Sequence, residues 1–540
     1  MTSADRPVRP ARTTRSAPAQ ESRAEIWSNA RYTLYWESVS RADLPPIRMA
    51  ATRTSRSMTS LHLLSLGACC LLLPASVRAS TATAERLDLT GQSIGYTALA
   101  LFGLGYLLVM AEEFTNLRKS KPVILTAGII WGLVAWEYRG TGMSHVVEAA
   151  FRHNLLEFAE LFLFLLVAMT YVNAMDERQV FETLRSWLVH RHCSYRLLFW
   201  ITGCLAFWLS PIIDNLTTAL VMCAVVLAVG KHNQRFVGLA CINIVVAANA
   251  GGAFSPFGDI TTLMVWQKGL IPFSKFFLLF IPSLVNFLVP AVAMHFFVPR
   301  GVPHAGGKTT HLHRGAKMII ALFALTITTA VCFHNFLHLP PMLGMMTGLA
   351  YLQLYGYYLK VTHRPLERNS GRYGVVGDIL PISGRERPFD VFARLARAEW
   401  DTLLFFYGVV MCVGGLGFIG YLAMTSEALY GTIGATGANI LVGILSAVID
   451  NIPVMFAVLS MNPDMPQGQW LLVTLTAGVG GSLLSIGSAA GVALMGQARG
   501  KYTFFTHLKW TPVIALGYAA SVLVHMWVNA GSYAIPAGSP

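Results

Sequence analysis

The 540-residue sequence has few charged residues for its length. Asp, Glu, Lys and Arg make up 12% of the chain, whereas soluble domains carry about 25%. Hydrophobic residues make up 54%, and the mean hydropathy is +0.54. A large soluble core would need shorter apolar runs with many more charges between them, so this class is excluded. Apolar runs of roughly 20 residues recur from about residue 94 onward, and each can cross ~30 Å of hydrocarbon.

Clustered cysteines are also missing. The eight cysteines are scattered, and no metal-type spacing is present. Five of them lie inside apolar segments, namely Cys204, Cys223, Cys241, Cys332 and Cys412. Neither a disulfide framework nor a structural metal site is therefore predicted.

Acidic residues are fewer than basic ones, 27 against 40, and the formal net charge is +13. Most of the excess lies in the first 60 residues and in the loops between apolar segments. This distribution is typical of membrane orientation signals. The sequence therefore predicts contact with a lipid bilayer and no nucleic-acid partner.

The N-terminal residues 1–79 are predicted to form an extension and targeting peptide outside the fold. Residues 1–57 are rich in Arg, Ser, Thr, Ala and Pro, and Leu61–Leu73 is a short apolar run followed by small residues up to Ala79. This order is typical of a secretory signal peptide. An organelle transit peptide is the alternative, and Met49 or Met58 could be the true start.

Loop charges give the apolar segments an orientation, because Lys and Arg mark cytoplasmic loops. A cytoplasmic location is predicted for the basic loops 118–121, 174–196, 299–316 and 360–398. Loops without Lys or Arg are predicted to be external, at 334–340, 424–437 and 462–469. Ten spans and two re-entrant hairpins satisfy every loop. The predicted units are a first transmembrane repeat at 90–298, a linker at 299–316 and a second repeat at 317–530.

Two copies of one motif interrupt the apolar pattern. Ser-Pro-Ile-Ile-Asp-Asn at 210–215 aligns with Ser-Ala-Val-Ile-Asp-Asn at 446–451, an offset of 236 residues. Downstream, the Gly-rich stretch 251–258 aligns with 480–487 at an offset of 229. The first hairpin has basic flanks and the second has none, so the repeats are predicted to be inverted. Discontinuous helices at matching positions of inverted halves indicate the binding site of a secondary transporter.

The motif acids Asp214 and Asp450 lie deep in apolar sequence, where a carboxylate costs roughly 2.5–3.5 kcal/mol on insertion scales. Capping of helix ends explains Asn215 and Asn451 in part, but capping does not require a charge. The two acids are therefore predicted to bind a cation or a proton.

The Gly-rich stretches add oxygen ligands of the kind that hard cations prefer. The first offers Asn249, Ser255, Asp259, Thr261 and Thr262, and the second offers Ser482, Ser485 and Ser488 without a carboxylate. Asp214, Asp259 and Asp450 are the predicted Na⁺ ligands, and the cation is expected closer to the first stretch.

A second titratable cluster has helical spacing. His153, Glu157 and Glu160 follow i, i+4, i+7 and so share one helix face. Glu160 is predicted to take part in a proton relay with the other two residues, and a structural ion pair is the alternative.

With these motifs the sequence resembles the NhaD-type Na⁺/H⁺ antiporters of the ion transporter superfamily. The matching residues are Ile213–Ala219, Gly251–Thr262 and Ile449–Val454. The resemblance implies export of Na⁺ or Li⁺ driven by inward H⁺, an elevator-like fold and a homodimer. It implies no enzyme activity and no cofactor besides the transported ions. The bacterial inner (plasma) membrane is the expected location, with a plastid envelope membrane as the alternative.

The site hypothesis is competition between Na⁺ and protons for the shared acids. Three alternatives remain: a Na⁺-coupled carboxylate or oxyanion carrier on the same fold, an intramembrane enzyme, and a passive channel. The first is disfavoured because the hairpin tips carry Asp. The second lacks a visible nucleophile–base pair or His cluster at mid-membrane.

Overall fold

The computed structural model describes residues 87–115, 117–191, 193–230, 233–302, 310–362 and 390–539. These residues belong to one compact unit, 83–540, which is separate from the unit 1–82. The predicted targeting peptide and much of the basic loop (363–389) lie outside the described residues. Residues 303–309 of the predicted linker also lie outside the described residues.

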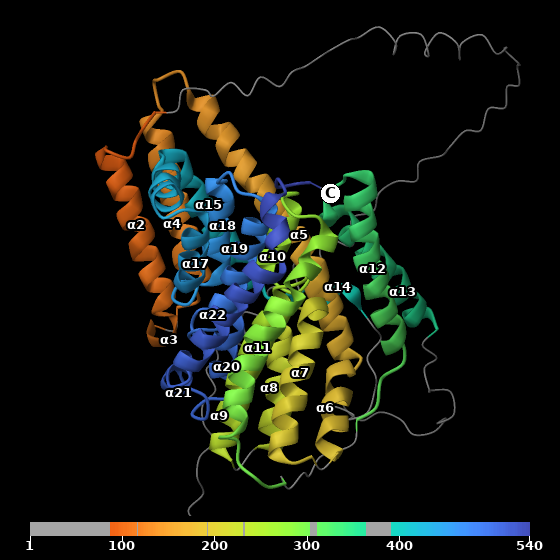
Figure 1. Cartoon of the computed structure of the whole chain (residues 1–540). Coiled ribbons are helices and arrows are strands. Elements are labelled where there is room, and N and C mark those ends of the chain that lie inside the picture. Colours follow the sequence, from red (N-terminus) through yellow and green to blue (C-terminus); the bar gives the residue numbers. More distant parts are fainter. Residues whose placement is uncertain are drawn as a thin grey trace, which may run out of the picture. The chain divides into compact units, whose positions relative to one another are not determined.

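Every regular element in these ranges is a helix, as expected for an all-α polytopic membrane protein (Figure 1). The first half holds α2 (Ser93–Met110), α3 (Glu112–Thr115), α4 (Ser120–Glu137), α5 (Ser144–Glu177), α6 (Val180–His190), α7 (Tyr195–Ile213), α8 (Asn215–Val229), α9 (Gln234–Gly252), α10 (Ile260–Gln267), the 3₁₀ helix η1 (Phe273–Leu279) and α11 (Phe280–His295). The second half holds α12 (Ala316–Leu337), α13 (Pro341–Val361), α14 (Val391–Leu395), α15 (Trp400–Ile419), α16 (Tyr421–Ser426), the π-helical turn η2 (Glu427–Gly431), α17 (Ala435–Leu445), α18 (Asn451–Met461), α19 (Gln467–Gly480), α20 (Ala489–Gln497), α21 (Phe504–Leu508), α22 (Thr511–Val528) and η3 (Ala530–Ala534).

Eight helices of the described part are long and apolar enough to cross a membrane, or nine if the bent pair 421–431 and 435–445 forms one span. Seven of the ten predicted spans are among the eight, and the eighth is α7, predicted as a hairpin arm. The remaining predicted spans are also helical, as α4, α13 and the interrupted pair α19–α20. The chain is therefore a multi-pass membrane protein, and the count of ten spans stays a prediction.

Two predicted boundaries are wrong. The segment predicted to span at 155–172 belongs to α5, whose 34 residues reach about 51 Å at 1.5 Å per residue. Its first turns carry His, Glu and Arg, which an apolar-run criterion leaves out. The segment 424–431, predicted as loop, is helical and meets α17 at 119°.

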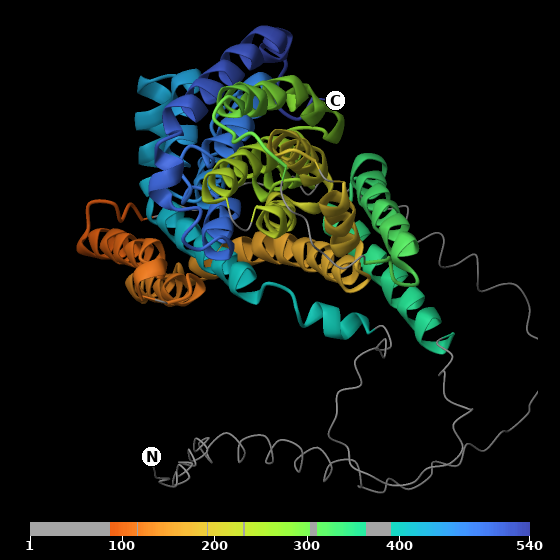
Figure 2. The ribbon, with the colours of Figure 1, turned by 90° about the horizontal axis from the view of Figure 1, so that it is seen from below.

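Two helix pairs flank the helices that contain the breaks. The α2–α4 pair packs on α15, and the α12–α13 pair packs on α5. Figure 1 and Figure 2 both show these pairs on opposite sides of the unit. The two helices on which these pairs pack, α5 and α15, also contact each other.

The two halves make matched contacts around their breaks. Ser210 Oγ donates to the carbonyl of Ala248 at 2.6 Å, and the aligned Ser446 Oγ donates to the carbonyl of Ala477 at 2.8 Å. A Cβ on Gly251 would lie 2.3 Å from the Phe207 oxygen, just as one on Gly480 would lie 2.0 Å from the Gly443 oxygen. These shared contacts support the internal repeat that the sequence predicts.

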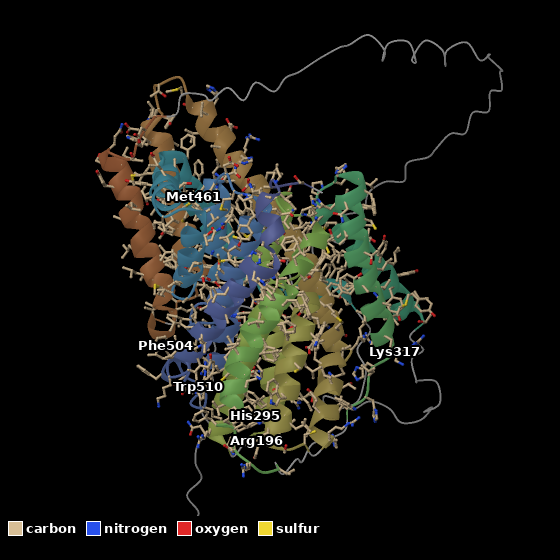
Figure 3. The ribbon with its side chains drawn as sticks, viewed as in Figure 1. Arg196, His295, Lys317, Met461, Phe504 and Trp510 are labelled. Carbon is tan, nitrogen blue, oxygen red and sulfur yellow. The ribbon has the colours of Figure 1, made fainter. Side chains whose placement is uncertain are left out.

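The ends of the unit agree with the orientation from loop charges. In Figure 3, Arg196 and Lys317, each at the end of a predicted cytoplasmic loop, lie in the lower part of the unit. Met461, beside a predicted external loop, lies in the upper part. Inversion of the two repeats across a membrane stays a prediction.

Candidate functional site

The first hairpin turns at Asp214, between α7 and α8. Pro211 interrupts the last turn of α7, and Asp214 has φ 85° and ψ 157°, a conformation that L residues rarely adopt. The carboxylate of Asp214 caps α8 by accepting from the Thr217 N–H at 2.7 Å. It also accepts from the Thr217 hydroxyl at 2.9 Å. Backbone strain held in place by a capping network is typical of functional sites.

The second hairpin turns just before Asn451, which begins α18. Asp450 occupies the capping position, but its side chain makes no capping bond. Its Oδ1 atom is buried without a hydrogen-bond partner among the described residues. The two motif acids therefore differ: the carboxylate of Asp214 has partners for both oxygens, and one oxygen of Asp450 remains available to a ligand.

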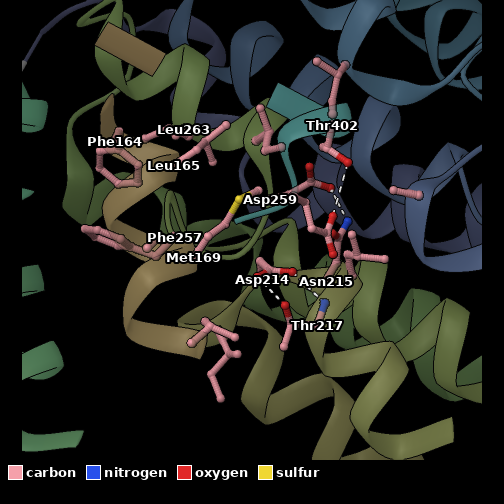
Figure 4. Close-up of a pocket in the computed structure, with 18 of the residues that line it drawn as sticks. Phe164, Leu165, Met169, Asp214, Asn215, Thr217, Phe257, Asp259, Leu263 and Thr402 are labelled. Carbon is pink, nitrogen blue, oxygen red and sulfur yellow. Dashed lines mark hydrogen bonds between the residues drawn. The ribbon is translucent and has the colours of Figure 1, made fainter. Parts of the chain in front are cut away.

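The third acid, Asp259, joins the two hairpins. It caps α10 after the break of the first Gly-rich span, and its Oδ1 accepts from the Thr261 N–H at 3.2 Å. Its Oδ2 accepts from the side-chain amide of Asn215 at 3.1 Å and from that of Asn451 at 3.0 Å. One carboxylate oxygen thus accepts hydrogen bonds from the asparagines of both Ile-Asp-Asn motifs. Figure 4 shows Asp259, Asn215 and Asp214 close together.

A second bridge crosses between the repeats. Asn249 accepts from Asn215 at 3.2 Å and donates to Ser488 Oγ at 3.0 Å. Ser488 aligns with Asp259 and has almost the same backbone, φ −143° and ψ 149° against −145° and 147°. Each caps the half-helix after its break. Capping is therefore sufficient to explain Ser488. Asp259 differs from Ser488 in adding a carboxylate at the same position of its repeat.

All three acids line one cavity, together with Asn215, Asn451 and Thr217 (Figure 4). Its volume is about 100 Å³ for the centres of water molecules, which is room for several waters. Lys119 and Glu399 also line it, and both adjoin loops predicted to be cytoplasmic. The cavity therefore extends toward the predicted cytoplasmic side.

The other predicted hydroxyls differ in their bonding. Thr262 Oγ1 already donates to the carbonyls of Ser255 and Asp259, and Ser255 Oγ donates to the Pro211 carbonyl. Ser482 Oγ donates to the Val479 carbonyl. Within the described part of the chain, Thr261 Oγ1 and Ser485 Oγ are buried without partners. The hydroxyls of Thr261 and Ser485 are thus freer to bind a ligand than those of Thr262 and Ser482, although neither residue is among those that line the cavity.

The predicted relay residues lie away from this cavity. His153 Nε2 lies 3.0 Å from Glu157 Oε1, as expected for a shared helix face. Glu157 also forms an ion pair with Lys268, which follows α10. The charges of Glu157 and Lys268 both act on the nearby Glu160. Neither glutamate lines the cavity. The Glu157–Lys268 pair favours the structural alternative for Glu157.

An aromatic layer adjoins the cavity on the α5 and α10 side. Phe164 and Phe257 both line the cavity, and their ring centroids are 5.6 Å apart. Phe257 continues the layer to Trp266 at 5.7 Å and to Phe273 at 6.1 Å. Glu160 precedes Phe164 by about one helical turn, so the aromatic layer begins one turn along α5 from this glutamate.

Sequence reasoning missed six polar residues of this region: Lys119, Asn173, Thr217, Lys268, Glu399 and Thr402. Thr217 follows the motif acid by three residues, the spacing of a capping partner, and this signal could have identified it. Lys119 was interpreted only as an orientation signal. For Lys268 and Glu399 the sequence carries no local signal, because their partners lie on distant helices.

The family model described as "Citrate transporter" matches residues 89–478. A protein of Alkalimonas amylolytica named Na(+)/H(+) antiporter NhaD is 59% identical over 483 residues, covering 88% of this chain and all of the relative. The antiporter NhaD of Vibrio parahaemolyticus is 62% identical over 75% of this chain and 98% of its own length. Sodium/proton antiporter 2 of Arabidopsis thaliana is 29% identical over 79% of this chain and 98% of its own. The chain therefore belongs to the family that the citrate transporter model describes and, within it, to the NhaD-type antiporters.

Proposed function

We propose that the protein is a secondary antiporter that exchanges cytoplasmic Na⁺ for external H⁺ by alternating access. One observation carries this proposal. Asp259 accepts hydrogen bonds from the asparagines of both hairpins, and it lines a single cavity with Asp214 and Asp450. Carboxylate and hydroxyl oxygens are the ligands that small hard cations prefer. The relatives at 59–62% identity are named Na⁺/H⁺ antiporters, which supports the same cargo here.

We assign different roles to the three acids. Asp259 holds the hairpin tips together through the hydrogen bonds that it accepts from the side-chain amides of both hairpins. Asp214 is fixed by its hydrogen bonds with Thr217. Asp450, with a free oxygen, is the acid most ready to take Na⁺ or a proton. The partnerless hydroxyls of Thr261 and Ser485 are candidate additional ligands.

Coupling follows from the cost of charge at bilayer depth. An uncompensated carboxylate there is unfavourable by several kcal/mol, so the site is stabilised when Na⁺ or a proton neutralises it. If only neutralised forms pass between inward- and outward-facing states, each Na⁺ exported is matched by protons returning. The same two cations compete for one set of oxygens, so neither can cross while the other occupies the site.

Four further features belong to the proposal. Li⁺ uses the same oxygen ligands and is expected as an alternative substrate. Glu160 with His153 is the proposed external proton path, and Glu157, predicted as its third member, is held in the ion pair with Lys268. A homodimer is expected from the resemblance to the NhaD-type antiporters, and a location in the bacterial inner (plasma) membrane by analogy with the bacterial relatives. A plastid envelope membrane is less favoured, because identity to the plant relatives is only 29–30%.

Reconstitution tests the proposal. Purified protein in vesicles containing a pH-sensitive dye should give a saturable pH change on addition of Na⁺, and also on addition of Li⁺. Asp214→Asn and Asp450→Asn should each abolish it. Vesicles that show no Na⁺-dependent proton movement would refute the proposal.

The description of the family model makes a carboxylate substrate the second candidate. A citrate or succinate anion entering this cavity would meet three aspartates and Glu399. Repulsion among like charges disfavours such binding. Uptake of labelled citrate or succinate by the same vesicles, driven by Na⁺, would support this candidate over proton exchange.

A further inference from the structure

Lys119 is a cation built into the wall of the acidic cavity. It precedes α4 and lines the cavity together with Asp450, Asp214 and Glu399. Its ammonium lies over the ring of Phe405 of α15, 4.6 Å from the centroid. Phe405 is fully buried, so the ring that holds the ammonium is fixed by packing.

Lys119 is placed to act on Asp450. Both residues line one small cavity, and Lys119 is the one Lys or Arg among the described residues that line it. An ammonium and a bound Na⁺ carry the same charge, so both cannot approach Asp450 without repelling each other. At an effective dielectric constant of about 20, and with screening by salt, repulsion between like charges in one cavity weakens cation binding by up to roughly tenfold.

We propose that Lys119 sets the Na⁺ affinity of the inward-facing site by acting as a tethered competitor for Asp450. The inference rests on the proposed exchange of Na⁺ for H⁺ and identifies a residue that tunes it. Lys119 belongs to the α4 side of the molecule, which packs on α15, whereas Asp450 belongs to the second hairpin. The competition therefore acts only in states that keep the hairpin tip near α15.

Other charges around Lys119 come from each neighbouring element. Glu399 precedes α15, Asp401 in α15 accepts from the Ser120 hydroxyl, and the Tyr106 hydroxyl of α2 lies beside Asp450. These groups are acids or neutral, so Lys119 is the positive charge that a cation meets among the described residues lining the cavity.

Three variants test the role of Lys119. Lys119→Gln removes the charge, Lys119→Arg retains it, and Lys121→Gln removes a neighbouring charge that is exposed and does not line the cavity. The readout is the Na⁺ concentration giving half-maximal exchange in vesicles, at fixed pH and with ionic strength held by choline chloride. Lys119→Gln should lower that concentration about threefold to tenfold, while the other two variants stay within about twofold of the unaltered protein.

A second readout does not depend on transport. The Na⁺ concentration needed to raise the thermal unfolding temperature in detergent should fall in parallel for Lys119→Gln, because ligand binding stabilises the folded state. An unchanged or raised half-saturation in Lys119→Gln, or an equal drop in Lys121→Gln, would overturn the inference. If the unaltered protein exchanges no Na⁺ for H⁺, the proposed function fails instead, and the two failures are thereby distinguished.

Discussion

The carboxylate of Asp259 has two separable roles, a structural one and an electrostatic one. Its Oδ2 atom accepts hydrogen bonds from the asparagines of both hairpins, and a neutral amide oxygen could accept them as well. Its charge, by contrast, is needed only for the cation. Substitutions of this single residue can therefore separate assembly of the site from its use.

Asp259→Asn should abolish Na⁺/H⁺ exchange but lower stability less than Asp259→Ala, because its one side-chain oxygen can still accept from the two asparagine amides although the Thr261 N–H loses its acceptor. Asp259→Ala should lose exchange and also stability, by about 1–3 kcal/mol, because two buried amides lose their acceptor. Exchange assays and unfolding in detergent measure the two effects. Equal stability of the Asn and Ala variants would contradict the structural role.

The residue identities of the site were predictable, but their division of labour was not. Asp214, Asp259 and Asp450 stand out in sequence because each is an acid in apolar surroundings. That Asp259 binds the asparagines of both motifs depends on how distant hairpins pack, and no local spacing encodes it. The ion pair between Lys268 and Glu157, which are distant in the sequence, was not predicted for the same reason.

At the scale of elements, close backbone contacts fix the hairpins against the broken helices. Gly480 of α19 faces the Gly443 carbonyl of α17, where a Cβ would lie 2.0 Å from the oxygen. Gly480→Ala should therefore push α17 away and lower both stability, by about 1–3 kcal/mol, and transport.

Gly132→Ala is the matched control, since no atom lies within 4 Å of the added Cβ in α4. It should leave exchange unchanged and raise stability by about 0.5–1 kcal/mol, the usual gain for Ala over Gly in a helix. Loss of exchange in both variants would show that the tight contact of Gly480 is not the cause.

A buried histidine ties the loop after α20 to the second break. His507 Nε2 donates to the Ser482 carbonyl at 2.9 Å, so Nδ1 accepts from the Tyr502 hydroxyl at 2.7 Å. Burial lowers the pKa of His507 to about 4, against about 6.5 in an unfolded chain. The folded state thus binds fewer protons than the unfolded one between these values.

Stability should therefore fall as the pH drops from about 6.5 toward 4, by about 1.4 kcal/mol per pH unit from this residue. Unfolding temperatures across this range, compared with those of His507→Gln, measure the effect. The variant should depend less steeply on pH, and an identical slope in both proteins would argue against the assignment.

The order of the elements was largely predictable from apolar runs and loop charges. Both hairpins and both broken helices lie where the Asp-Asn and Gly-rich interruptions indicate, with breaks at 253–259 and 481–488. The length of α5 and the helix at 421–431 were not predictable in this way. Polar residues such as His153 and Glu157 extend a helix beyond the apolar part without changing its backbone.

For the whole molecule, the cavity reaches Lys119 and Glu399 near predicted cytoplasmic loops, and the Phe164–Phe257 pair adjoins it. Thr402 also lines the cavity. In a background without other cysteines, Thr402→Cys should react with a membrane-impermeant maleimide from the cytoplasmic side and far more slowly from outside. Faster labelling from outside would contradict the predicted orientation.

The central claim is that acids from both repeats form one site for Na⁺ and H⁺. Its most direct test is Na⁺-driven proton movement by purified protein in vesicles, compared with Asp214→Asn and Asp450→Asn. Saturable exchange is predicted for the unaltered protein and its loss in each variant, with all three proteins folded. Exchange that persists at the unaltered rate in both variants would contradict the claim.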